Sequence, residues 1–211
     1  MATGTNNQVS SVLTIPATWN RATGSRFQAA STRGDTPTTG LMRPGPVGTN
    51  PPVMRRKGVT PIAMTIQAAE VDAQVESAEI IQGKMSEPSG PYVVAWYEDT
   101  GSLGEAANLV FSGHLDYYDV GEAVFFHLTE LSGGDLITVT GENDEDFDYT
   151  VDWVRTYTQD ELDESAVKEI VGRTDTEQLT LITCSGAFDF DNGIYHDRTI
   201  VRATRGTPSA Q

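Results

Sequence analysis

Short apolar and β-branched segments alternate with turn residues from residue 61 onward, at intervals typical of an all-β barrel or sandwich. Val71, Ala73 and Val75 occupy every second position, which is the period of a strand with one buried face. The segments that predict strands are 62–66, 71–80, 93–97, 109–113, 135–140, 149–157, 179–183 and 199–204. The pattern therefore predicts a mainly β fold of seven or eight strands.

Two segments have the spacing of short helices instead. Apolar residues within 123–131 recur at intervals of three and four, and the segment is followed by the glycine pair 133–134. Residues 163–171 give a second candidate, which stops at Gly172. We therefore expect two or so short helices beside the strands.

Residues 1–58 show no sustained hydrophobic period and are rich in Pro, Thr and Gly, with chain breakers at 43–46 and 50–52. Such a segment cannot bury enough apolar surface to offset the entropy that it would lose on ordering. We therefore predict a flexible basic tail or linker at 1–58, one folded domain at 59–206 and a disordered C-terminus at 207–211.

The formal charge of −16 is unevenly distributed. Residues 1–60 carry seven Arg or Lys and one acidic residue, which leaves seven basic and 29 acidic residues in the remainder. A domain this acidic repels phosphate backbones, which argues against a nucleic-acid partner. The basic run 55–57 is too short to indicate a membrane surface. No apolar run approaches the roughly 20 residues that cross a bilayer and no signal-peptide pattern is present, so the sequence predicts a soluble chain.

The spacing of Asp144, Asp146 and Asp148 matches part of a calcium loop, but the following glycine and the distal bidentate glutamate are missing. We interpret this segment as a solvated acidic turn. Cys184 is the single cysteine, which excludes an internal disulfide framework and a multi-cysteine zinc site. The sequence therefore predicts no metal site, and no cofactor is expected.

Three residues at strand ends carry candidate chemistry. Cys184 and His114 each follow an apolar strand, at a place where a side chain emerges from a rigid scaffold. Arg198 opens the last strand, after a predicted loop at 187–197. A cysteine nucleophile requires a lowered pKa or a nearby base, together with a donor for the developing oxyanion. The imidazole can supply the base, and the guanidinium can supply the donor for the oxyanion.

These placements resemble the sortase family, whose pattern is a Thr-Leu-X-Thr-Cys strand end, an earlier Gly-His at a strand end and an Arg just before the last strand. The chain carries Thr180-Leu-Ile-Thr-Cys184, Gly113-His114 and Arg198 in that order, over about residues 60–205. Around these motifs, residues 113–118, 121–128, 134–135 and 184–189 are most similar to class E and class F sortases. The resemblance implies a closed eight-stranded barrel, which agrees with the strand count, and a catalytic domain at 59–206.

The resemblance also implies a two-step cysteine transpeptidase. The Cys184 thiolate would attack the carbonyl of a Thr–Gly bond and form a thioester, while His114 protonates the leaving amine and later deprotonates the acceptor amine. Arg198 would hold the substrate and help to stabilise the oxyanion, assisted by Thr183 and the backbone N–H of Ser185.

Other polar residues near these motifs have alternative interpretations. Arg202 lies four residues after Arg198 on the same face of the strand, so periodicity does not separate them, and the family pattern favours Arg198. Asp116, two residues after the candidate histidine, is a hypothesis for tuning or orienting the imidazole. His127 and His196 align with no catalytic histidine of the family, and we interpret both as structural.

The implied substrate is a Leu-Pro-X-Thr-Gly-like sorting signal of surface proteins, and the implied acceptor is an amine such as that of a peptidoglycan stem peptide. This activity would be extracytoplasmic, at the cell surface or the cell-wall side of the membrane. The membrane anchor that the family usually carries is missing from this sequence. Two alternatives stay open, a cysteine endopeptidase that releases its product by hydrolysis and a catalytically silent barrel that only binds peptides.

Overall fold

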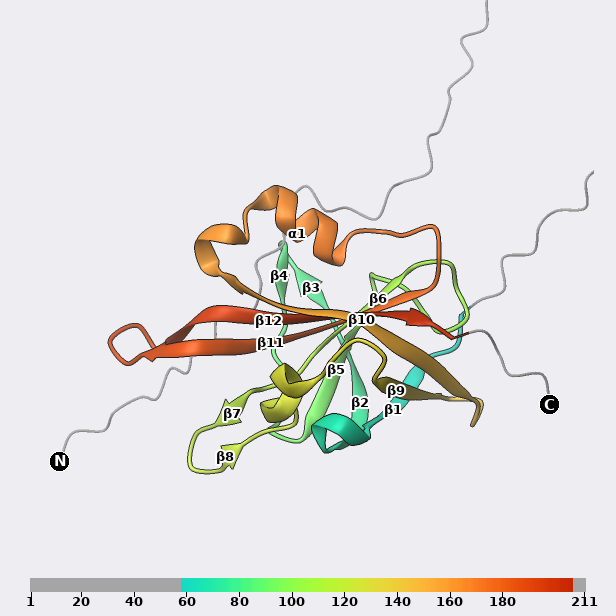
Figure 1. Cartoon of the computed structure of the whole chain (residues 1–211), viewed down its shortest axis with the longest axis horizontal. Helices are drawn as coiled ribbons and strands as arrows, with labels where there is room; N and C mark the ends of the chain where they lie inside the picture. Colours follow the sequence, from blue (N-terminus) through green and yellow to red (C-terminus); the bar gives the residue numbers. More distant parts are fainter. Residues whose placement is uncertain (1–57, 207–211) are drawn as a thin grey trace, which may run out of the picture.

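The computed structural model describes residues 58–206 (Figure 1). The predicted tail, except Gly58, and the predicted C-terminus at 207–211 lie outside the described residues, and the domain boundaries stay a prediction. The described part is built around eight principal strands: β1 (Pro61–Ile66), β2 (Val71–Ala78), β5 (Val93–Tyr97), β6 (Asn108–Ser112), β9 (Leu136–Gly141), β10 (Asp146–Thr158), β11 (Gln178–Asp189) and β12 (Ile194–Arg205).

These strands close into a barrel in the order β1-β2-β5-β6-β11-β12-β10-β9. The pairs β2 with β5 and β6 with β11 are parallel, and the other ladders are antiparallel. The prediction of a mainly β, closed barrel is therefore confirmed. The parallel pairing of β6 with β11 matters most for function, because it brings the two strands that precede His114 and Cys184 side by side.

Smaller elements decorate the barrel. The two-residue strands form two small hairpins, β3 (Ile80–Ile81) with β4 (Lys84–Met85) and β7 (Asp116–Tyr117) with β8 (Gly121–Glu122). The described helices are α1 (Glu164–Val171) and the 3-10 helices η1 (Gln67–Ala69), η2 (Phe126–Glu130) and η3 (Gln159–Glu161). The expected helix at 123–131 is thus a 3-10 helix at 126–130, whereas the second expected helix is the α-helix α1, whose N-cap Asp163 accepts a hydrogen bond from Ala166 N at 2.8 Å.

Strand β6 and the barrel segments 179–183 of β11 and 198–203 of β12 are buried on both faces. Their inward side chains, such as Phe111, Leu181 and Val201, join the barrel core. Their outward side chains pack instead against α1, which lies across the outside of the barrel (Figure 1). Three apolar side chains of α1 take part, and complete burial of such a side chain stabilises the fold by about 1.5–3 kcal/mol. Packing from two sides fixes the strand ends that carry the candidate site.

The β11–β12 hairpin differs from the prediction. The prediction of a loop at 187–197 is wrong for most of these residues, because β11 continues to Asp189 and β12 begins at Ile194. We call residues 186–196 the arm, which projects to the left in Figure 1. A register shift lies at the base of the arm, where Gly186 has a φ of +78°. A Cβ at this glycine would lie 2.2 Å from Asp197 Oδ2, so a larger residue does not fit.

Candidate functional site

The three candidate residues belong to adjacent strands. Arg198 of β12 is the register partner of Cys184 on β11. On the other side of β11, Ile182 pairs with Ser112, the last residue of β6, and two more residues along each chain lead to Cys184 and His114. Neighbouring strands are about 4.8 Å apart. The strand register therefore brings His114, Cys184 and Arg198 to the same end of three neighbouring strands.

The backbone at His114 is held from several directions. Gly113 N donates to Ile182 O at 3.2 Å, and Phe125 N donates to His114 O at 2.9 Å. A Cβ at Gly113 would lie 2.5 Å from Phe125 Cδ2, which explains why glycine precedes the histidine. The imidazole Nε2 lies 3.3 Å from Pro88 O. Its position is thus set by main-chain contacts of both β11 and the segment around η2.

The two polar neighbours of Cys184 have different environments. Thr183 Oγ1 donates to Gly113 O at 2.9 Å, so its hydroxyl proton is used to hold the peptide before His114. Ser185 is buried, and its Oγ has no hydrogen-bond partner among residues 58–206. A buried hydroxyl without a partner costs free energy. The Ser185 hydroxyl is therefore a buried group on the opposite face of β11 from the Cys184 thiol, since successive side chains of a strand point to opposite faces.

The two arginines on the outer face of β12 have distinct partners. Arg198 Nη1 donates to Tyr195 O at 2.9 Å and to Asp197 O at 2.7 Å. Arg202 lies opposite Thr180, and its Nη2 donates to Ile170 O at 2.7 Å, near the C-terminal end of α1. Burial lowers the pKa of Arg202. A cation at a helix C-terminus is stabilising, so Arg202 serves the packing of α1 while Arg198 lies beside the cysteine.

Comparison with protein families supplies the identity. A model described as the sortase domain matches residues 64–206, which is most of the chain. The chain belongs to the sortase family. Sortases are extracytoplasmic cysteine transpeptidases, which agrees with the kind of chemistry that the thiol, imidazole and guanidinium can perform. A comparison with curated proteins finds no significant sequence match.

Solved sortases of several classes share the fold. Sortase A from Corynebacterium diphtheriae, in a lid mutant, is 17% identical with a TM-score of 0.54, and the match covers 74% of each chain. Sortase D5 transpeptidase from Clostridium perfringens is 19% identical with a TM-score of 0.52 over 70% of this chain and 79% of that one. Sortase C1 from Streptococcus agalactiae is 21% identical with a TM-score of 0.51 over 70% and 68%. The barrel is therefore a sortase fold.

Asp116 of this sortase contacts the arm. Its Oδ2 accepts a hydrogen bond from the Tyr195 hydroxyl, and Tyr195 is a residue that the sequence analysis missed. The imidazole of His114 lies edge-on to Tyr117, with ring centroids 5.3 Å apart. A second overlooked residue is Glu87, whose pKa is raised because the effect of burial outweighs the opposing effects of His114 and Lys84. Neither Tyr195 nor Glu87 belongs to a motif, so no local pattern identified them.

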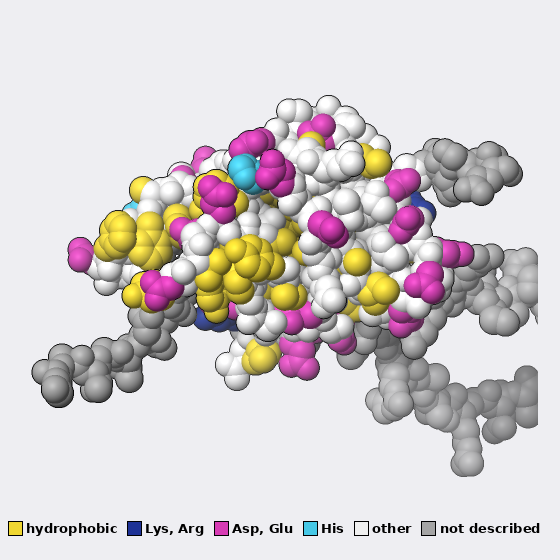
Figure 2. Space-filling model, turned by 90° about the horizontal axis from the view of Figure 1, so that it is seen from below, with side chains coloured by type: hydrophobic (Ala, Val, Ile, Leu, Met, Phe, Trp, Pro, Cys, Tyr) yellow, Lys and Arg dark blue, Asp and Glu magenta, His cyan; other side chains and the backbone are white. Residues whose placement is uncertain are grey.

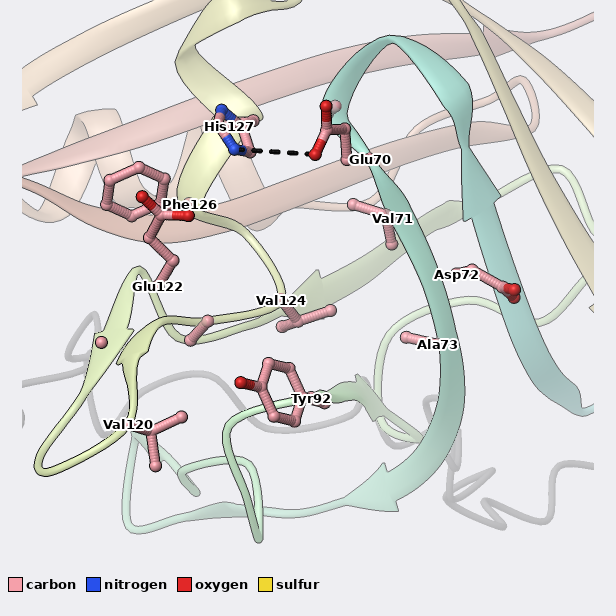
Figure 3. A pocket seen from close by; sticks show the side chains of 13 residues that line it. Glu70, Val71, Asp72, Ala73, Tyr92, Val120, Glu122, Val124, Phe126 and His127 are labelled. Atoms are coloured by element: carbon pink, nitrogen blue, oxygen red, sulfur yellow. Dashed lines mark ion pairs between the residues drawn. The ribbon is translucent and has the colours of Figure 1, made fainter.

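The other two histidines lie elsewhere. His196 is an exposed residue of the arm. His127 lines a cavity of about 590 Å³, where Figure 3 shows its imidazole turned toward Glu70 at 4.0 Å. Its Nδ1 lies 2.7 Å from Glu130 Oε1, and this hydrogen bond is the main reason why the pKa of His127 is raised. Tyr92 lines the same cavity and follows the segment whose Pro88 O contacts the imidazole of His114.

The surface of the described domain is acidic. Figure 2 shows Asp and Glu side chains spread over one face, with few Lys or Arg among them. Asp146 and Asp148, which the sequence assigned to the acidic turn, lie at the start of β10 and accept hydrogen bonds from Thr140 and Thr138 of β9. Within residues 58–206, no three His, Cys, Asp or Glu side chains gather closely enough to hold a metal ion. The same residues include no helix that is long and apolar enough to span a membrane.

Proposed function

We propose that this sortase cleaves a Leu-Pro-X-Thr-Gly-like sorting signal between Thr and Gly and transfers the new acyl group to an amine. The observation that carries this proposal is the register of three strands. Cys184 has Arg198 as its direct partner on β12, and the parallel pairing with β6 ends two residues before His114. A nucleophile, an acid–base group and a fixed cation thus lie at the same end of three adjacent, rigid strands.

The first step is attack of the Cys184 thiolate on the carbonyl carbon of the Thr–Gly bond. A carbon–sulfur bond forms, the carbon–nitrogen bond breaks, and the leaving amine takes a proton from the His114 imidazolium. The product is a thioester between Cys184 and the threonine carbonyl. The contact of the His114 imidazole with Pro88 O supports this role, because an acid must keep one orientation toward the leaving nitrogen.

The second step is attack of an acceptor amine on the thioester. The nitrogen forms the new amide bond, its proton passes to His114, and the carbon–sulfur bond breaks to return the thiolate. Water in place of the amine would give a free carboxylate instead. Transfer and hydrolysis therefore require the same residues, and the acceptor decides between them.

Arg198 is the proposed cation for the tetrahedral oxyanion and the substrate backbone. Two of its hydrogen bonds go to main-chain carbonyls of the β11–β12 hairpin, which orient the guanidinium before substrate binds. We assign the backbone N–H of Ser185, the residue after the nucleophile, to the substrate carbonyl region. Thr183 contributes through the Gly113 carbonyl to which it donates, rather than with a free hydroxyl proton.

The likeness of residues 113–118 and 184–189 to class E and class F sortases extends the proposal to that subgroup. The acceptor is then an amine of a peptidoglycan stem peptide or of another surface protein, on the cell-wall side of the membrane. An acidic domain suits a positively charged amine acceptor better than an anionic one, because like charges repel.

Mass spectrometry of the full chain with Leu-Pro-X-Thr-Gly-like peptides and an oligoglycine or diaminopimelate-type amine tests the proposal. A peptide–amine product, together with a thioester adduct on Cys184, supports transpeptidation. The matched control is Cys184→Ala, which must form neither species. A free carboxylate alone would favour the endopeptidase, and thiol labelling of Cys184 with no reaction on any peptide would favour a silent binding barrel.

A further inference from the structure

Two hairpins meet beside the candidate site through Asp116 and Tyr195, which are 79 positions apart in the sequence. The β7–β8 hairpin begins at Asp116, two residues after His114, and the arm ends at His196, two residues before Arg198. The Tyr195 hydroxyl donates to Asp116 Oδ2 across the gap. We call this contact the inter-hairpin bond.

Tyr195 is anchored at three points. Its ring packs against Phe188, its register partner across the arm, with centroids 4.9 Å apart. Its carbonyl accepts a hydrogen bond from Arg198 Nη1 at 2.9 Å. Its hydroxyl makes the inter-hairpin bond to Asp116. One residue therefore links the guanidinium beside Cys184 to the hairpin that directly follows the imidazole.

The hairpin on the other side transmits this contact to His114. Asp116 pairs with Glu122 in the β7–β8 ladder, and Ala123 N donates to Leu115 O at 3.0 Å. The neighbouring Tyr117 ring lies edge-on to the His114 imidazole. A shift of Asp116 relative to the arm would therefore displace the segment that holds the imidazole.

We propose that Tyr195 is a positioning residue, which fixes the separation of the imidazole from the thiol through the inter-hairpin bond. This inference rests on the proposed roles of Cys184, His114 and Arg198. It assigns to Asp116 an anchoring role through its acceptor oxygen, in place of electrostatic tuning of the imidazole. The pKa of Tyr195 is raised by burial, by the bond to Asp116 and by Cys184.

The pH dependence of Cys184 alkylation by iodoacetamide tests the inference without any substrate. Thiolate formation depends on the nearby positive groups and therefore on their separation from sulfur. Tyr195→Phe and Asp116→Ala should both shift the rate–pH curve, and the double variant should match the single ones, because each change breaks the same bond. Asp116→Asn keeps an acceptor oxygen and should stay close to wild type.

Tyr118→Phe is the matched control, because Tyr118 lies in the turn of the β7–β8 hairpin with 61% of its surface exposed. Its curve should superimpose on that of the wild type. With a peptide that the enzyme accepts, Tyr195→Phe should lower kcat about tenfold with little change in KM, since a misplacement near 1 Å costs up to about 100-fold. The proposal is overturned by a wild-type curve for Tyr195→Phe, by multiplying effects in the double variant, or by a shift in Asp116→Asn as large as in Asp116→Ala. Peptide turnover by Cys184→Ala would instead refute the proposed function itself.

Discussion

Arg198 lies directly opposite Cys184 in the β11–β12 ladder, whereas Arg202, on the same face, lies opposite Thr180 and donates to Ile170 O near the end of α1. Four residues along one strand therefore separate a cation beside the nucleophile from a cation that supports the packing of a helix. The different positions of the two arginines give the first prediction.

Arg198→Ala should lower the kcat/KM of each folded molecule about 100-fold or more, because oxyanion donors contribute at that scale, and it should also lower thermal stability, because Tyr195 O and Asp197 O lose a charged donor. Arg202→Ala should destabilise the fold by about 2–3 kcal/mol, since buried carbonyls lose a charged donor, while each folded molecule keeps its activity. Thermal melts and turnover measured on both variants make the comparison. An inactive Arg202→Ala of wild-type stability would reverse the assignment.

Thr183→Val should lower both stability and activity. The variant keeps the shape of the side chain but leaves Gly113 O, next to His114, without its donor, at a cost of about 1–3 kcal/mol. Thr183→Ser retains the hydroxyl and is the matched control in melts and turnover assays. Wild-type stability in Thr183→Val, combined with lost activity, would indicate a hydroxyl that acts on substrate instead.

Gly113→Ala should destabilise the domain by about 1–3 kcal/mol and displace the imidazole, because the new methyl group would overlap the Phe125 ring. Gly90→Ala is the control, since a Cβ there meets nothing within 4 Å. Differential scanning calorimetry gives the two stabilities, and alkylation of Cys184 gives the effect on the site. Equal behaviour of the two variants would contradict the close approach at Gly113.

His127 should titrate above the ordinary pKa of about 6.5, because its hydrogen bond to Glu130 favours the imidazolium. Its contribution to folding is then fully present below about pH 6.5 and is lost as the pH rises through the higher folded-state pKa. An NMR titration of the imidazole protons measures this value. Glu130→Gln should move it back down, and an unchanged titration curve would rule out the hydrogen bond as the cause.

The strand ends were predictable because strands with two buried faces are apolar over several residues and stop where polar chemistry begins. Cys184 and His114 each follow such a run, and the fold places the two runs on neighbouring strands. Their chemical roles stay a prediction. The arm was missed because its acidic and polar residues resemble a loop, whereas the pairing of Phe188 with Tyr195 extends the ladder.

Contacts between segments that are distant in the sequence could not be predicted from hydrophobic periodicity. The distinction between Arg198 and Arg202 depends on where α1 packs, and α1 lies outside the local pattern of β12. The partner of Asp116 is likewise decided by the meeting of two hairpins, which no spacing in either hairpin encodes. The short segment 126–130 forms a 3-10 helix, and a sequence period of three to four residues does not separate that helix from an α-helix.

Each strand of a closed barrel has a neighbour on both sides, and this limits the ways in which the domain can bind a sorting peptide. An extended ligand cannot join the barrel by β-augmentation, because each principal strand already has neighbours on both sides. Within residues 58–206, open ladder edges remain on the arm, on the two small hairpins and beside the two-residue pairing of β5 with β6. Discrimination among peptides is therefore expected from side-chain contacts more than from strand pairing, and a change on the arm would act on the strand ends as well, because Tyr195 joins the arm to the hairpin that follows His114.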